Sequence, residues 1–144
     1  MQIVQIQTAA HIIAITDWQD YRRDGGQFLN TAVQAYQKKK TTFNSEALYN
    51  LVCMGIEKYI MATLMRQGDL AENHTMLDLM DALERHTGPL TIREDLLFLE
   101  KFQEICSLEN AYYATPTDEE IARIIQIGLE IEAMLLPFLA ETKE

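Results

Sequence analysis

Apolar residues recur at three- and four-residue steps along most of this chain, which is the spacing that places them on one face of an α-helix. The first clear stripe runs from Trp18 to Tyr36 and continues through Gly25 and Gly26. Glycine on an inward face lets a neighbouring helix approach closely, so we expect one helix through both glycines despite a cost of about 1 kcal/mol each. Residues 3–15 either extend this helix backward or form a separate element, and their opening Gln-Ile alternation also permits a short strand.

A second long helix follows a turn that ends at Asn44. Asn44 or Ser45 supplies the side-chain oxygen that commonly caps a helix N-terminus. Apolar residues then recur at helical spacing over residues 48–64, with Gly55 on the inner face. Gly68 is the natural stop, because glycine readily adopts the left-handed conformation that ends many helices. The sequence thus predicts two long helices, each with glycine on its buried side.

A shorter helix is predicted between Thr75 and Gly88. Thr75, three residues before Asp78, fits an N-cap position, and the Gly88-Pro89 pair ends the helix. His86 falls in the last turn, where an imidazole interacts favourably with the negative end of the helix dipole.

The last two predicted helices are each opened by a capping box, in which a threonine and a glutamate three residues later satisfy each other's free backbone donors. Thr91 and Glu94 form the first box, and this helix is expected to run to about Leu108. Thr117 and Glu120 open the second. Its inner face carries the residues Ile121, Ile124, Ile125, Gly128, Ile131 and Leu135.

These elements predict one all-α domain over residues 1–144, an up-and-down bundle of four to five helices in which Pro137 kinks or ends the last one. No apolar run reaches the ~20 residues that a membrane span needs. No basic residue precedes an apolar stretch at the N-terminus, as a secretory signal would require, so we expect a cytoplasmic protein. Cys53 and Cys106 lie in apolar periodic segments, are expected to act as small buried residues, and do not demand a disulfide.

Charge is unevenly distributed along the chain, whose net charge is −10. Through Arg66 there are seven Lys and Arg against five Asp and Glu, whereas from Gln67 onward there are five against seventeen. Nonspecific nucleic-acid binding depends on neutralising phosphates, so the acidic half disfavours a nucleic-acid partner. The one basic run, the lysines at 38–40, comes at a predicted helix end, where it complements the helix dipole.

The common catalytic and metal-binding motifs do not occur in the sequence. The paired glycines lie inside a helical stripe rather than in a phosphate loop, no cysteine pair has zinc spacing, and no Glu-x-x-His motif is present. We therefore expect no metal and no cofactor. His11 is expected to be a packed or capping residue, and His74 either bonds free backbone donors or lines a pocket. Tyr112 and Tyr113 either cover the core or form a binding rim or dimer interface.

Glu57 and Lys58 fall on or beside the buried stripe of the second helix. A carboxylate so close to the core needs a partner, because burying an unpaired charge is costly. Arg22, Arg23 or Lys58 would supply one. We favour a structural ion pair here over a binding site between helices.

The order of motifs along the chain resembles a known superfamily. Residues 55–60, Gly-Ile-Glu-Lys-Tyr-Ile, are followed by Gly-Asp at 68–69 and by His-Thr-Met-Leu-Asp-Leu at 74–79. This order resembles the HEPN superfamily (higher eukaryote and prokaryote nucleotide-binding domains), in which an Ala-Glu-Lys-rich second helix commonly precedes a His-Asp-Leu-like helix start. Residues 113–116, Tyr-Ala-Thr-Pro, before an acidic helix start, are similar to the Arg-Tyr-Pro turn of prokaryotic members. The resemblance covers about residues 18–140.

The resemblance implies a four- to five-helix bundle, usually a homodimer, often encoded beside a minimal nucleotidyltransferase as a toxin–antitoxin pair. Many members are metal-independent ribonucleases whose site pairs an Arg and a His one to two helical turns apart, about four to seven residues. In this chain Arg85 and His86 are adjacent, Arg66 and His74 are separated by a predicted helix end, and residues 114–116 read Ala-Thr-Pro. These changes remove the cation and the general acid–base that metal-free RNA cleavage needs.

Two functions of different classes follow from the resemblance. The first is a non-catalytic HEPN-like module, a homodimer that recognises a nucleotidyltransferase-like protein or a nucleotide. Its candidate binding residues are Glu57, Lys58, Arg66, His74, Tyr112 and Tyr113. The second is a metal-independent ribonuclease or toxin built around Arg66 and His74.

A third hypothesis needs no family: an unrelated helical adaptor or oligomerisation domain. The dimer expectation also has a physical basis, because residues 3–15 carry more apolar surface than one edge of a small bundle easily buries. Residues 1–16 are accordingly expected to extend the first helix or to form a dimer arm.

Overall fold

The described part of the chain is entirely α-helical, as predicted. The computed structural model describes residues 17–39, 43–71, 73, 75–102 and 115–140, and no strand occurs among them. Five helices make up this part: α2 (Trp18–Gln37), α3 (Ser45–Arg66), α4 (Met76–Thr87), α5 (Arg93–Glu100) and α6 (Asp118–Leu139). The first of them runs unbroken through the paired glycines, which confirms that prediction.

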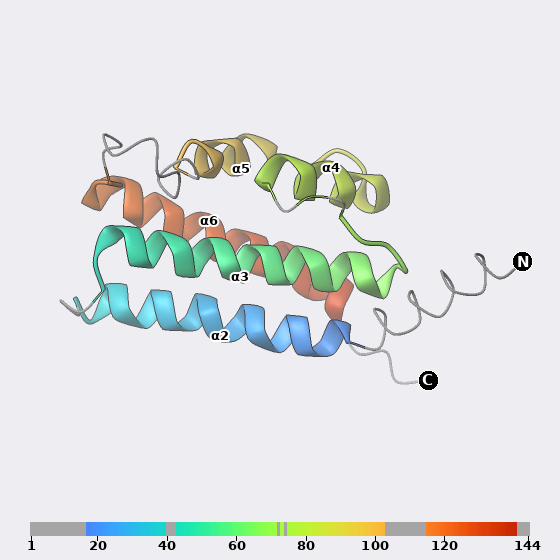
Figure 1. Cartoon of the computed structure of the whole chain (residues 1–144), viewed down its shortest axis with the longest axis horizontal. Helices are drawn as coiled ribbons and strands as arrows, with labels where there is room; N and C mark the ends of the chain where they lie inside the picture. The colour runs from blue at the N-terminus through green and yellow to red at the C-terminus, as the bar shows by residue number, and fades with distance from the viewer. Residues whose placement is uncertain (1–16, 40–42, 72, 74, 103–114, 141–144) are drawn as a thin grey trace, which may run out of the picture.

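Helix α3 is the centre of the bundle. Figure 1 shows the three long helices α2, α3 and α6 running side by side, with the shorter α4 and α5 along one edge of this layer. Accordingly α3 packs against α2, α4 and α6. Residues 59–65 of α3 are all buried, which is the pattern of a helix surrounded by neighbours on every side.

Helix α2 turns a narrow face of mostly small residues toward this centre. Its buried residues are Gly25, Leu29, Ala32 and Ala35. Tyr36, which the sequence pattern placed on the same face, is 37% exposed instead. The stripe continues from Ala32 to Ala35, three residues on, so the next position is rotated by about 100° away from the core.

The backbones of α2 and α3 meet at Gly25 and Gly55. A Cβ atom on Gly25 would lie 3.1 Å from the carbonyl oxygen of Gly55, and a Cβ on Gly55 would lie 3.1 Å from the carbonyl oxygen of Gly25. These are backbone atoms, so no change of rotamer relieves the contact. On α6, a Cβ on Gly128 would lie 2.7 Å from Cδ1 of Leu29. Glycine on the inner faces therefore allows the close approach that the sequence predicted.

Three helix starts have the predicted side-chain caps. Asn44 caps α3, Thr75 caps α4, and Thr117 forms a complete capping box at the start of α6. Gly68 and Gly88 follow the ends of α3 and α4 with φ angles of 76° and 78°, in the left-handed region that glycine favours. Local sequence thus sets most of the helix boundaries.

The capping box predicted at Thr91 is wrong. Helix α5 begins at Arg93, with Ile92 at the N-cap position and no side-chain cap. Glu84 of α4 fixes this turn instead, because its carboxylate accepts from the Leu90 N–H at 2.9 Å and from the Arg93 guanidinium at 2.6 Å. Bonds to another helix have replaced the local cap.

Two further predicted helix ends need correction. Helix α5 ends at Glu100 rather than near Leu108, and the intervening residues 103–108 lie outside the described part. Of the two effects predicted for Pro137, a kink or an end, the end is wrong, because α6 continues to Leu139.

Cys53 is half-buried against the core rather than fully buried, and Cys106 lies outside the described residues, as do residues 1–16. Within the described helices, none combines the length and apolar character that crossing a membrane requires.

We predict that Gly55→Ala lowers the free energy of unfolding by about 1–3 kcal/mol, because its Cβ would collide with the α2 backbone. Helix propensity alone would favour alanine by about 1 kcal/mol. Urea denaturation measures the change. Ala133→Gly, at an exposed position of α6, is the control and should cost about 1 kcal/mol through propensity alone. A Gly55→Ala variant more stable than the wild type would contradict the close contact.

Candidate functional site

The structure describes half of the candidate site residues, and all of these lie on α3: Glu57, Lys58 and Arg66. The other candidates lie outside the described residues: His74, Tyr112 and Tyr113. None of the three described candidates lines either of the two pockets presented below.

The partners predicted for Glu57 make other contacts in the structure. The Lys58 ammonium lies 4.4 Å from the ring centroid of Tyr21 on α2, which is a cation–π contact. Arg23 pairs with acidic residues of its own helix, and Arg22 bonds to α6. The rotation of α2 about its axis decides these partners, and the sequence pattern did not fix that rotation.

Arg22 and Arg66 together hold the C-terminus of α6. Arg22 donates to the Leu139 carbonyl at 3.0 Å, and Arg66 donates to the Phe138 carbonyl at 2.7 Å. The Arg66 guanidinium also lies 4.8 Å from the ring centroid of Trp18. The last turn of α6 has no basic residue of its own. Two neighbouring helices therefore supply the donors and positive charge that its last carbonyls need.

A pocket of about 400 Å³ lies between α2, α3 and α6, with Tyr59 and Glu132 in its lining. Tyr59 is buried and donates its hydroxyl to Oε2 of Glu132 at 2.5 Å. A Cβ atom on Gly26 of α2 would lie 3.1 Å from the Tyr59 hydroxyl. Because glycine has no Cβ, this side of the hydroxyl stays uncovered. Burial raises the pKa of Tyr59 far above its usual value, and the bond to Glu132 raises it further, whereas Arg22 lowers it. The phenol therefore stays protonated and acts as a donor.

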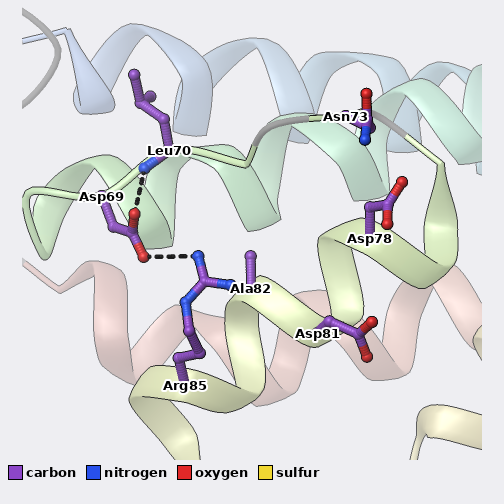
Figure 2. Close-up of a pocket in the computed structure, with 7 residues that line it drawn as sticks. All are labelled: Asp69, Leu70, Asn73, Asp78, Asp81, Ala82 and Arg85. Atoms are coloured by element: carbon purple, nitrogen blue, oxygen red, sulfur yellow. Dashed lines mark hydrogen bonds and ion pairs between the residues drawn. The ribbon is translucent and has the colours of Figure 1, made fainter.

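A second pocket, of about 440 Å³, lies between the α3–α4 connection and α4 (Figure 2). Its lining consists of Asp69, Leu70, Asn73, Asp78, Asp81, Ala82 and Arg85. Oδ1 of Asp69 accepts from the Leu70 N–H at 2.8 Å, and Oδ2 accepts from Arg85 at 3.0 Å. Nε2 of His86 lies 2.8 Å from the same Oδ2 atom. Asp69 thus ties the chain just after α3 to the last turn of α4.

The hydrogen bonds to Asp69 change its acidity. Burial raises the pKa of Asp69, but the bonds from His86, Arg85 and the Leu70 N–H together lower it below the usual aspartate value. His86 lies in the last turn of α4, as predicted for a dipole partner, and its contact with Asp69 adds a role that the sequence did not indicate. Asn73, next to the undescribed His74, lines this pocket.

Tyr59 and Asp69 are suited to hydrogen bonding rather than to proton transfer. A general acid or base works best with a pKa near the operating pH. The pKa of Tyr59 is raised well above that range, and the pKa of Asp69 is held below it. Among the residues that the structure describes, no group of three His, Cys, Asp or Glu side chains could hold a metal ion.

Sequence reasoning missed Tyr59, Glu132 and Asp69 as site residues. One signal was available: Glu132 follows Ile131 in a helix with an apolar inner face, and a carboxylate there needs a partner, as argued for Glu57. Nothing comparable marked Asp69, whose bonds depend on how the α3–α4 connection folds back on α4.

We predict that Tyr59→Phe lowers the free energy of unfolding by about 1–2 kcal/mol, because Glu132 loses its buried donor. Tyr21→Phe is the matched control. The Tyr21 hydroxyl makes no hydrogen bond within the described residues, and phenylalanine keeps the ring that Lys58 contacts. Urea denaturation should show a change below about 0.5 kcal/mol for this control. Equal losses in both variants would contradict a stabilising Tyr59–Glu132 bond.

We predict that Asp69→Asn lowers the free energy of unfolding by about 1 kcal/mol at neutral pH. The folded-state pKa of Asp69 is lowered, so its contribution is present above the unfolded pKa of about 4 and is lost as the pH falls through the folded value. Urea denaturation at a series of pH values should therefore show the two proteins converging in acid.

The control for this pH series is Asp20→Asn, which removes an exposed pair with Arg23. It should cost at most about 0.5 kcal/mol at neutral pH, because exposed ion pairs contribute little. A difference between wild type and Asp69→Asn that stays constant across the pH range would contradict the predicted linkage.

The comparisons with known proteins assign this chain to no family. No protein-family model, curated protein sequence or solved structure matches it. The HEPN resemblance therefore rests on the sequence motifs alone.

Proposed function

We propose that this chain is a non-catalytic, HEPN-like binding module. The observation that carries the proposal is the placement of Arg66, the cation that the ribonuclease alternative requires. Arg66 donates to the Phe138 carbonyl at 2.7 Å and lies over the ring of Trp18. Binding a phosphate would take Arg66 away from both contacts and leave the end of α6 without one of its two arginine donors.

The other arginines support the same proposal, because each has a protein partner in the structure. Arg22 bonds the Leu139 carbonyl, and the remaining four pair with carboxylates: Arg23 with Asp20, Arg85 with Asp69, Arg93 with Glu84 and Arg123 with Asp95. Ribonucleases stabilise developing charge on phosphate with cations aimed at it. Arginines that already bond carbonyls and carboxylates of their own chain are not aimed at a phosphate. This arrangement favours a binding role over RNA cleavage.

We propose a protein as the partner, in keeping with the nucleotidyltransferase-like protein that the resemblance implies, and a nucleotide as the alternative ligand. Two exposed leucines of α6 favour the protein, since Leu129 and Leu136 are 36% and 37% exposed and apolar patches of this kind commonly meet partners. The acidic second half of the chain disfavours nucleic acid. The module would act in the cytoplasm, as a homodimer.

The proposal predicts that the purified protein leaves structured and single-stranded RNA intact, with or without EDTA, in a gel-based cleavage assay. Its arginines bond protein groups, and neither the raised pKa of Tyr59 nor the lowered pKa of Asp69 is shifted toward neutrality. Cleavage by the wild type would contradict the proposal if it disappeared in both Arg66→Ala and His74→Ala. Arg123→Ala, which removes an exposed arginine outside both pockets, is the control and should behave as the wild type.

A further inference from the structure

Helix α6 is apolar on its outer face as well as on its inner face. Ala122, Leu129, Ala133 and Leu136 are all exposed. Their spacing of seven, four and three residues places them on one side of the helix. We call these four residues the α6 outer stripe. It is about 21 Å long, because each helical residue advances 1.5 Å.

The outer stripe does not contribute to the buried core of the described chain. The inner face of α6 is already buried, and its members are Ile121, Ile124, Ile125, Ile127, Gly128, Ile131, Leu135 and Leu139. The stripe lies beside this face, since Leu129 is one helical turn from Ile125, and so extends the apolar surface of α6 beyond what the described helices bury. A second helix laid along the stripe would cover it, since paired helices bury apolar residues at this spacing.

Acidic side chains border the outer stripe along one edge, where the exposed Glu119 and Glu130 lie. Along the other edge Glu132 accepts from the Tyr59 hydroxyl, and Arg22 and Arg23 line the same pocket as Leu136. The only basic residue of α6, Arg123, is directed away to α5. Its guanidinium lies 3.8 Å from the ring centroid of Phe98, and it pairs with Asp95 at 3.4 Å. The stripe is thus an apolar strip with one negatively charged edge.

This charge identifies the occupant. A second copy of the chain would bring like-charged borders together, and like charges facing each other across an interface are repulsive. A helix with lysine or arginine beside its apolar face would be attracted. Leu136 also borders the Tyr59 pocket, which offers an adjacent hollow for an anchoring side chain.

We propose that the α6 outer stripe binds an amphipathic helix of a partner protein, with basic residues along the side of its apolar face that meets Glu119 and Glu130. The proposal rests on the proposed function, since it identifies the partner and the surface of a non-catalytic binding module. Leu129 and Leu136 supply the apolar contact, while Glu119 and Glu130 supply attraction and the choice of partner.

Two synthetic helical peptides of about 18 residues test the proposal. Both carry leucine at helical spacing, and one has lysine beside the leucines where the other has glutamate. Fluorescence anisotropy with the full chain should show the lysine peptide binding at least about tenfold more tightly, with an affinity that falls as salt rises. Replacing Glu119 and Glu130 by glutamine should reduce this preference.

Leu129→Ser with Leu136→Ser should weaken binding of the lysine peptide at least about tenfold. Leu97→Ser is the matched control, because Leu97 is also exposed, at 43%, but lies on α5. This control should bind as the wild type does, and circular dichroism confirms that each variant is folded.

Three results would overturn the proposal: equal binding of the two peptides, no weakening in the double serine variant, or a dimer that sedimentation shows to dissociate in that variant. The last result would make a second copy the occupant of the stripe. RNA cleavage that depends on Arg66 and His74 would overturn the proposed function instead. Intact RNA without selective peptide binding would overturn this inference alone.

Discussion

The contact between the backbones of Gly25 and Gly55 is the constraint on which the rest of the bundle depends. It sets α2 against α3 so closely that Leu29 reaches α6, where Gly128 leaves room for its Cδ1 atom. On α2, Gly26 leaves the Tyr59 pocket open. A side chain at either crossing glycine would push α2 outward, and the packing around Leu29 would be lost together with the pocket. Core and candidate site therefore depend on one helix crossing.

Local sequence predicted the parts of this fold that depend on local interactions. Helical periodicity located every described helix, and Asn44 and Thr117 cap the helices they were expected to cap. The failure at Thr91 is instructive, because the box residues were present and a carboxylate of another helix, Glu84, took over the turn. A local pattern states what a segment prefers alone, and tertiary bonds of similar strength can outweigh it.

The candidate site was harder to predict because its bonds join distant parts of the chain. The Tyr59–Glu132 bond links residues 73 positions apart, and no pattern within either helix specifies the partner. The same limit applied to Glu57, which the sequence correctly placed beside the core without specifying a single partner for it. Sequence shows which polar groups need a bond. Helix rotation and crossing determine where that bond is made.

The bonds of Arg22 and Arg66 to the end of α6 also define the smallest unit of this domain. They connect residues 117 and 72 positions apart, so the first and last described helices form a single end of the bundle. A shortened chain that stopped before Phe138 would lose both carbonyl acceptors and leave two guanidinium groups without them. Domain boundaries for expression, fusion or circular permutation therefore have to keep the start of α2 and the final turn of α6 together.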